Sequence, residues 1–139
     1  MRVDSRDVTV LVLDPAILDG EMIAMALSVR GYLARAVRTE AEAIGALRAR
    51  GGIRRVLIDG ALLRREPALA RRIQLRFPVE VVLMLSDGGA VPAEALWGIS
   101  GVIEKSARYP EVAGGFEAQV EPLARCAERH GLKAVASGL

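Results

Sequence analysis

Residues 8–15 read Val-Thr-Val-Leu-Val-Leu-Asp-Pro, a β-branched apolar run that ends in an acid and a proline. The run has no helical period, and a strand that is apolar on both faces is typical of the middle of a parallel sheet covered by helices. Asp14 suits the N-cap of a helix and Pro15 its first helical position. These eight residues predict a buried parallel strand followed at once by a helix.

The same alternation of strand and helix continues along the chain. Further strands are predicted at 32–37, 56–58, 79–85 and 102–104, and helices at about 14–31, 39–50, 68–76 and 92–97 and over a last apolar pattern that starts at residue 112. Strands that alternate with helices form a parallel sheet through right-handed crossovers. The sequence therefore predicts an α/β fold, doubly wound, with helices on both faces of the sheet.

The apolar spacing assigns an inward face to the first helix and places a cap at the second. Leu18, Met22, Met25 and Val29 follow at spacings of four, three and four, which predicts that this face is buried. In the second helix we expect a capping box between Thr39 and Glu42, with Ile44 and Leu47 facing inward.

The last helix is predicted from Val112, Phe116, Val120 and Leu123, and Pro122 should kink or restart it because proline lacks a backbone donor. We therefore expect one domain over residues 1–124 and a helical extension or tail over 125–139. That tail could dock weakly or support a homodimer.

Composition excludes several classes of protein. The 139 residues suit one domain, and 52% hydrophobic against 26% charged residues gives ample material for a core. A net charge of +2 without a basic stripe argues against nucleic-acid binding, and the single cysteine, Cys126, cannot form an intrachain disulfide. No signal sequence and no apolar run of membrane-spanning length is present, so we expect a cytoplasmic protein with no membrane contact.

Four polar residues stand at the carboxyl ends of predicted strands: Asp14, Asp59, Ser86 and Lys105. Ligands of open parallel sheets bind at this edge, so side chains from distant stretches should meet there. Two carboxylates, a hydroxyl and an ammonium suit phosphoryl transfer to an aspartate, with one acid as nucleophile and another helping to hold Mg²⁺.

Two segments carry a resemblance to a known family. Val-Leu-Ile-Asp-Gly at 56–60 and Gly-Ile-Ser-Gly-Val-Ile-Glu-Lys at 98–105 are similar to the acceptor strand and the GA-x-G-(aromatic)-x-x-K segment of receiver domains. Over about residues 8–124 the chain resembles the receiver domain of bacterial two-component response regulators, including the single-domain chemotaxis-regulator type. The resemblance implies a flavodoxin-like, five-stranded sheet in the order 2-1-3-4-5.

The resemblance also implies roles for single residues. Asp59 would accept the phosphoryl group, Ser86 would be the switch hydroxyl and Lys105 would contact the phosphate. Asp14, Asp59 and Ala61 would ligate Mg²⁺. The chain would be a stand-alone signalling domain rather than an enzyme, at most weakly dephosphorylating itself. Its partners would be a histidine kinase or phosphotransfer protein and a downstream protein.

The chain departs from the family pattern at several positions. Pro15 replaces the second acid, which weakens the expected Mg²⁺ site, and Asp87 follows the hydroxyl where a small residue is usual. Val102 replaces the switch aromatic and Ser106 the proline after the lysine. These departures favour an alternative, a pseudo-receiver that binds proteins without being phosphorylated.

Simpler interpretations of each residue remain open. Asp14 could be only a helix cap, Asp59 could start a turn, and Ser86 could bind loop backbone. Lys105 could pair with Asp59 without any phosphate. A small hydrolase or nucleotide-binding protein is the enzyme alternative, but the chain lacks a Gly-rich phosphate loop, a nucleophile elbow and a usable histidine, since His130 suits a solvated helix end.

Overall fold

The structure is a computed structural model that describes residues 9–49, 52–86, 89–106 and 108–130, with Thr9 and residues 120–130 described by their backbone alone. Its elements, in chain order, are β1 (Thr9–Leu13), α1 (Ile17–Val29), β2 (Leu33–Val37), α2 (Glu40–Ala49), β3 (Ile53–Asp59), α3 (Gly60–Arg65), α4 (Leu69–Arg76), β4 (Glu80–Leu85), the 3₁₀ helix η2 (Ala93–Leu96), β5 (Ile99–Glu104) and α5 (Tyr109–His130). Strands and helices alternate as predicted.

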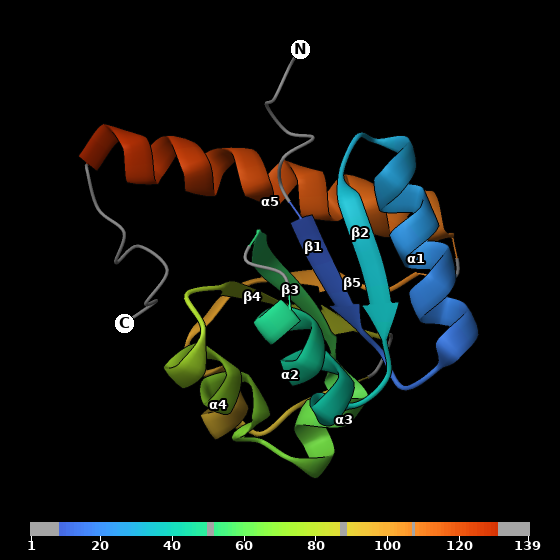
Figure 1. Cartoon of the computed structure of the whole chain (residues 1–139), viewed down its shortest axis with the longest axis vertical. Coiled ribbons are helices and arrows are strands. Elements are labelled where there is room, and N and C mark those ends of the chain that lie inside the picture. The colour runs from blue at the N-terminus through green and yellow to red at the C-terminus, as the bar shows by residue number, and fades with distance from the viewer. Residues whose placement is uncertain (1–8, 50–51, 87–88, 107, 131–139) are drawn as a thin grey trace.

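The strands form one sheet in the order β2-β1-β3-β4-β5, and all neighbours pair in parallel. In Figure 1, α1 and α5 lie on one side of the sheet, and α2, α3 and α4 lie on the other. The predicted fold class, the doubly wound arrangement and the strand order are confirmed. All five strands run in the same direction, so their carboxyl ends share one edge of the sheet.

Each face of the sheet has its own hydrophobic core. One core joins β1, β3 and β4 to α2, α3 and α4, and the other joins the same strands to α1 and α5. β1 supplies both, with Leu11 and Leu13 on one face and Val10 and Val12 on the other, all fully buried. The sequence pattern at residues 8–13 predicted this two-sided burial correctly.

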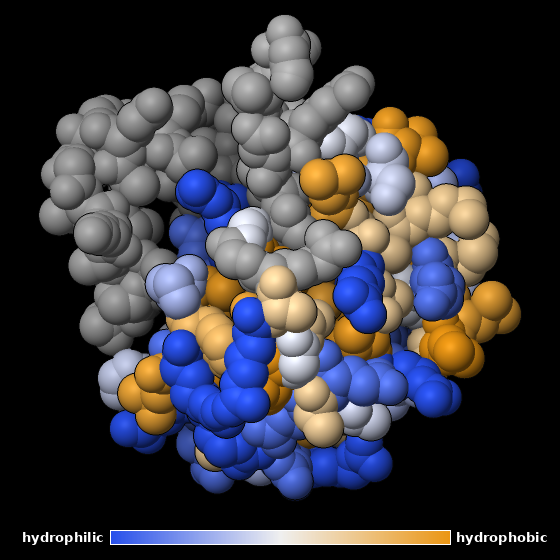
Figure 2. Space-filling view, viewed as in Figure 1, coloured by the Kyte–Doolittle hydropathy of each residue, from blue (hydrophilic) through white to orange (hydrophobic). Residues whose placement is uncertain are grey.

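The predicted inward face of α1 is wrong. Leu18, Met25 and Val29 are 67%, 59% and 82% exposed, whereas the buried residues are Gly20, Ile23, Ala24 and Leu27. Apolar residues lie all round this helix, so spacing alone could not select a face. Figure 2 shows hydrophobic side chains gathered on the side of the molecule where Figure 1 places α1.

Small residues decide which face of α1 meets the sheet. A Cβ added at Gly20 would lie 3.4 Å from the Cβ atoms of both Ala36 and Asp14. Because Gly20 and Ala24 are small, α1 packs closely on β1 and β2, and the longer side chains at 18, 25 and 29 are left outside.

Several element boundaries differ from the prediction. α1 begins at Ile17 rather than directly after Asp14, because the Asp14 carboxylate accepts the Ala16 N–H at 2.9 Å and forms a turn there. β3 and β5 are longer than predicted, and the short helix α3 was missed. The second helix starts near the expected cap: Glu42 N–H donates to Thr39 Oγ1, but the Glu42 carboxylate accepts from Arg38 N–H rather than from Thr39.

α5 continues without a break through Pro122 to His130, so the restart expected there is wrong. Val112 and Phe116 face the core as predicted. The side chains of Val120, Leu123 and Cys126 lie outside the described part, and so does the rest of the predicted tail after His130. The domain boundary at 124 stays a prediction. No helix within the described ranges is long and apolar enough to cross a membrane.

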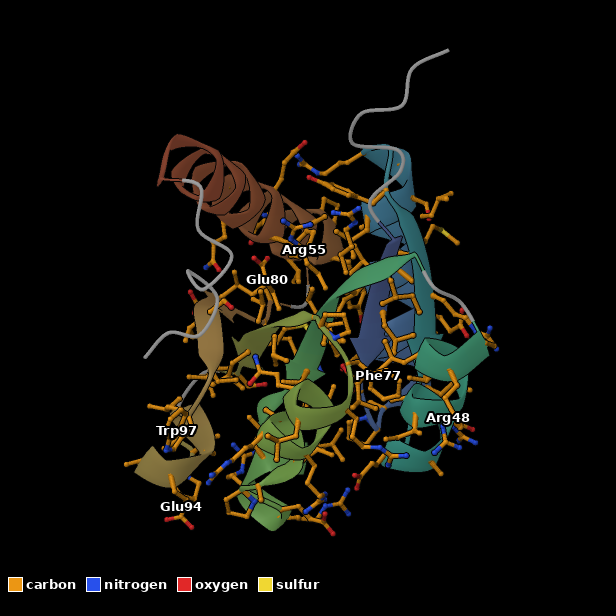
Figure 3. The ribbon with its side chains drawn as sticks, turned by 60° about the vertical axis from the view of Figure 1, so that its left-hand side comes forward. Arg48, Arg55, Phe77, Glu80, Glu94 and Trp97 are labelled. Carbon is orange, nitrogen blue, oxygen red and sulfur yellow. The ribbon has the colours of Figure 1, made fainter. Side chains whose placement is uncertain are left out.

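An ion pair between a buried arginine and a half-buried glutamate joins β3 and β4 at the end of the sheet opposite the carboxyl edge. Arg55 and Glu80 are register partners, and Arg55 Nε lies 3.1 Å from Glu80 Oε1. Figure 3 shows the two side chains close together below α5. Because a register slip of β4 would separate these charges, the pair favours the observed strand alignment.

Two glycines provide a matched test of backbone conformation. Gly98, between η2 and β5, has a φ of +78°, and an added Cβ would clash with the Gln74 amide oxygen. The Gln74 amide nitrogen donates to Gly98 O at 2.7 Å. Gly98→Ala is therefore expected to lower the free energy of unfolding by about 2 kcal/mol. Gly45 lies in α2 with nothing within 4 Å of its Cβ position, so Gly45→Ala should raise it by about 0.5–1 kcal/mol. Urea denaturation measures both, and equal effects would contradict the argument.

Candidate functional site

The carboxyl edge of the sheet brings three of the four predicted polar residues together. Asp14 follows β1, Asp59 ends β3 and Lys105 follows β5. The backbone N–H of Lys105 donates to Leu85 O at 2.7 Å, which ties this residue to the end of β4. Asp14 and Asp59 are only 1% and 6% exposed, so two acids are buried at this edge.

The Lys105 ammonium lies between the acids. Its Nζ is 2.6 Å from Asp14 Oδ2 and 3.0 Å from Asp59 Oδ1, and the Lys105 side chain is 10% exposed. The other oxygen of each carboxylate accepts a backbone N–H: Asp14 Oδ1 that of Ala16 at 2.9 Å, and Asp59 Oδ2 that of Ala61 at 3.0 Å. Sequence reasoning predicted the convergence of Asp14, Asp59 and Lys105, and the distances confirm it.

A third acid that sequence reasoning missed also contacts Lys105. Asp19, in the first turn of α1, has Oδ2 3.2 Å from Lys105 Nζ, and its Oδ1 accepts the Tyr109 hydroxyl hydrogen at 2.9 Å. The available signal was the acid five residues after Asp14, on the first turn of the helix that starts at this edge. Tyr109 had no sequence signal, because only the packing of α5 on α1 brings it there.

Burial and the hydrogen bonds around the Lys105 ammonium shift the pKa values of Asp14, Lys105, Asp19 and Tyr109. Burial raises the pKa of Asp14, and the hydrogen bond from Lys105 only partly opposes this shift. Burial alone would lower the pKa of Lys105, but its contacts with Asp14 and Asp59 outweigh that effect and raise it. The Tyr109 hydrogen bond lowers the pKa of Asp19, and the same bond raises the pKa of Tyr109. Lys105 is therefore held firmly as a cation.

Comparison with solved structures places this edge in a known fold. The chain is similar to a response regulator from Thermotoga maritima (22% identity, TM-score 0.68, covering 82% of this chain and 98% of that one). It is also similar to the CheY-like receiver domain from Methylobacillus flagellatus (18% identity, TM-score 0.62, covering 86% of this chain and 97% of that one). The chain has the receiver fold.

A third similar chain lies in the crystal structure of the phosphorylated P1 domain of CheA3 in complex with CheY6 from R. sphaeroides (16% identity, TM-score 0.58, 84% and 96% coverage). No protein-family model and no curated protein matches the sequence. At these identities the similarity establishes the receiver fold and not the chemistry, which has to be argued from the residues at the edge.

The described oxygens suit the lysine better than a divalent cation. Pro15 adds no side-chain oxygen, and each oxygen of the Asp14 and Asp59 carboxylates already contacts a nitrogen. Within the described residues, no three His, Cys, Asp or Glu side chains are grouped as a metal site requires. Ligation of Mg²⁺ by Asp14, Asp59 and Ala61 therefore stays a prediction.

Of the other residues predicted for the receiver site, Ser86 and Val102 do not take part in the ion pairs of Lys105. Ser86 follows β4 and is exposed, and its hydroxyl forms no hydrogen bond with the described residues. Asp87 lies outside the described part. Val102 is 46% exposed on β5, where its carbonyl accepts from Gln119 Nε2 at 2.6 Å.

Ser106, where the resemblance leads one to expect a proline, forms two hydrogen bonds near the start of α5. Its hydroxyl oxygen accepts the Arg108 N–H at 2.9 Å and its hydroxyl donates to Glu111 Oε1 at 3.1 Å. Through these two hydrogen bonds Ser106 stabilises the backbone at the start of α5.

Proposed function

We propose that this chain is an atypical receiver module that accepts a phosphoryl group on Asp59 and signals through protein contacts. The observation that carries the proposal is the 3.0 Å contact between Lys105 Nζ and Asp59 Oδ1 at the carboxyl edge of a receiver fold. A buried carboxylate with a fixed cation beside it is the arrangement that transfer of an anionic group requires.

The proposed chemistry is a transfer of the phosphoryl group from a phosphohistidine. An Asp59 carboxylate oxygen attacks phosphorus, the new O–P bond forms as the N–P bond breaks, and the imidazole leaves with a proton from solvent. Lys105 neutralises charge on the phosphoryl oxygens, and the Ala61 N–H holds the second Asp59 oxygen in place. No enzymatic turnover is proposed beyond weak self-dephosphorylation.

The proposal implies two kinds of protein partner. A histidine kinase or phosphotransfer protein would supply the phosphoryl group in the cytoplasm, as the similar complex of the phosphorylated P1 domain of CheA3 with CheY6 suggests. A downstream protein would dock on η2, β5 and α5, where Leu96, Trp97 and Val102 are about half exposed. Trp97 is held outward there, with the Arg71 guanidinium 5.3 Å from its ring centre, and Figure 3 shows it at the edge of the molecule.

A second candidate function is a pseudo-receiver that binds partners without phosphorylation. The observation that favours it is the neutralised acid pair: Lys105 contacts both carboxylates, and Pro15 supplies no acid for a cation. In that case the ion pair is a structural element of the fold.

Incubation with phosphoramidate separates the two functions. We expect the intact wild-type protein to gain the mass of one phosphoryl group, both with Mg²⁺ and, more slowly, with EDTA. A parallel Mg²⁺ titration followed by the fluorescence of Trp97, the single tryptophan, tests the predicted metal ligands. A wild-type protein that gains no mass under either condition would remove the acceptor proposal and leave the pseudo-receiver.

A further inference from the structure

Asp19 is held at both of its carboxylate oxygens by residues from two other elements. Lys105 Nζ, after β5, lies 3.2 Å from Oδ2, and the hydroxyl of Tyr109, the first residue of α5, donates to Oδ1 at 2.9 Å. One side chain on α1 therefore joins the lysine of the acidic edge to the start of α5. Figure 1 shows α1 and α5 on the same face of the sheet.

These contacts form a continuous line from the proposed acceptor. It runs from Asp59 Oδ1 to Lys105 Nζ at 3.0 Å, on to Asp19 and then to the Tyr109 hydroxyl. Because a single ammonium serves three acids, any added negative charge at Asp59 competes directly with Asp19 for it. These three contacts link Asp59 to Tyr109 without a gap.

The route that the sequence resemblance implied cannot serve this purpose. Val102 has neither a ring nor a hydroxyl, and its side chain is half exposed. The Ser86 hydroxyl makes no hydrogen bond to the described part of the chain. By contrast, each contact from Asp59 to Tyr109 lies within hydrogen-bond or ion-pair distance.

We propose that Asp19 is a positioning residue for the Lys105 ammonium, and that with Tyr109 it carries the state of Asp59 to the first turn of α5. The signalling part of this inference rests on the proposed function, whereas the linkage itself exists in the unmodified protein. When Asp59 carries a phosphoryl group, the ammonium follows the added charge. Asp19 then keeps only Tyr109, and the start of α5 shifts with it.

The composition allows a direct spectroscopic test on the full chain. It contains two lysines, Lys105 and Lys133, and two tyrosines, Tyr32 and Tyr109. Protein labelled with ¹⁵N-lysine and ¹³C-tyrosine gives two signals of each kind, assigned by Lys133→Arg and Tyr109→Phe. A thermal unfolding curve is recorded for each variant to check that it is folded.

We expect Lys105→Met to shift the Tyr109 signal of the otherwise wild-type protein. In a protein that already carries Asp19→Asn, the same substitution should leave the Tyr109 signal unchanged. Tyr109→Phe should shift the Lys105 ammonium signal in turn, since coupling is reciprocal; this second measurement carries the test if Lys105→Met does not fold. Asp19→Glu should restore part of the coupling. Glu21→Gln, an exposed acid on the same helix, should shift neither signal.

The inference would be overturned if Lys105→Met left the Tyr109 signal unchanged. It would also be overturned if Lys105→Met shifted that signal equally in the wild-type and Asp19→Asn backgrounds. Failure of phosphorylation is a separate result, because the variants are compared without any phosphodonor. If the wild type is phosphorylated but the Tyr109 signal stays fixed, the proposed function stands and the signalling part of the inference does not.

Discussion

Asp59→Asn is expected to abolish phosphoryl incorporation from a small phosphodonor, while the wild type gains one group per chain. Asp59 is the acid at the end of the central strand β3, 6% exposed and fixed by Lys105 and the Ala61 N–H. Asparagine keeps the shape and one acceptor oxygen but is no nucleophile at phosphorus. Intact-protein mass spectrometry measures the loss directly, and peptide mapping places the group.

The matched control is Asp14→Asn, which removes a buried acid that contacts the same ammonium. This variant should still be modified, more slowly, because its nucleophile is intact. Incorporation into Asp59→Asn, or loss confined to Asp14→Asn, would move the acceptor away from Asp59.

Lys105→Met is expected to lower the free energy of unfolding by about 3 kcal/mol at neutral pH, because it leaves buried acids without their cation. Asp14 and Asp59 are almost fully buried, and the Lys105 side chain is 10% exposed, so water cannot replace the lost contacts. Urea denaturation measures the difference. Adding Asp14→Asn to Lys105→Met should recover part of the loss, since one unpaired acid is removed.

The effect of Lys105→Met should depend on pH in a defined direction. The pKa of Lys105 is raised above its ordinary value of 10.5 in the folded protein. Its contribution is therefore fully present below that value and is lost as the pH rises through the folded pKa. Asp14, with a raised pKa, costs stability above its ordinary value of 3.8 and not below it, so the deficit of Lys105→Met should shrink in acid.

The control for this prediction removes an exposed cation instead. Arg35→Met, on the edge strand β2, should change the unfolding free energy by less than about 0.5 kcal/mol in acid, at neutral pH and in alkali. A similar loss in both variants would mean that net charge, rather than the buried ion pair, sets the stability.

The sequence predicted the order of elements because a strand buried on both faces can be recognised from its continuous run of apolar residues. A strand covered on both faces must be apolar at successive positions, as residues 10–13 are. By contrast, α1 is apolar all round, and the inward face predicted for it from spacing was wrong. The close approach of Gly20 to Ala36 and Asp14, together with the burial of the small Ala24, decided that face. Short elements such as α3 carry too few residues for a period to show.

For the site, the sequence by itself determined that an acid after β1, an acid at the end of β3 and a lysine after β5 meet at one edge. Strand direction alone places residues at the carboxyl ends of parallel strands together. Only the tertiary structure decided that Asp19 and Tyr109 join them, and that Lys105 is shared among three acids. The physical reason is that these contacts depend on how α1 and α5 pack against each other, and side-chain packing between helices leaves no periodic trace along the chain.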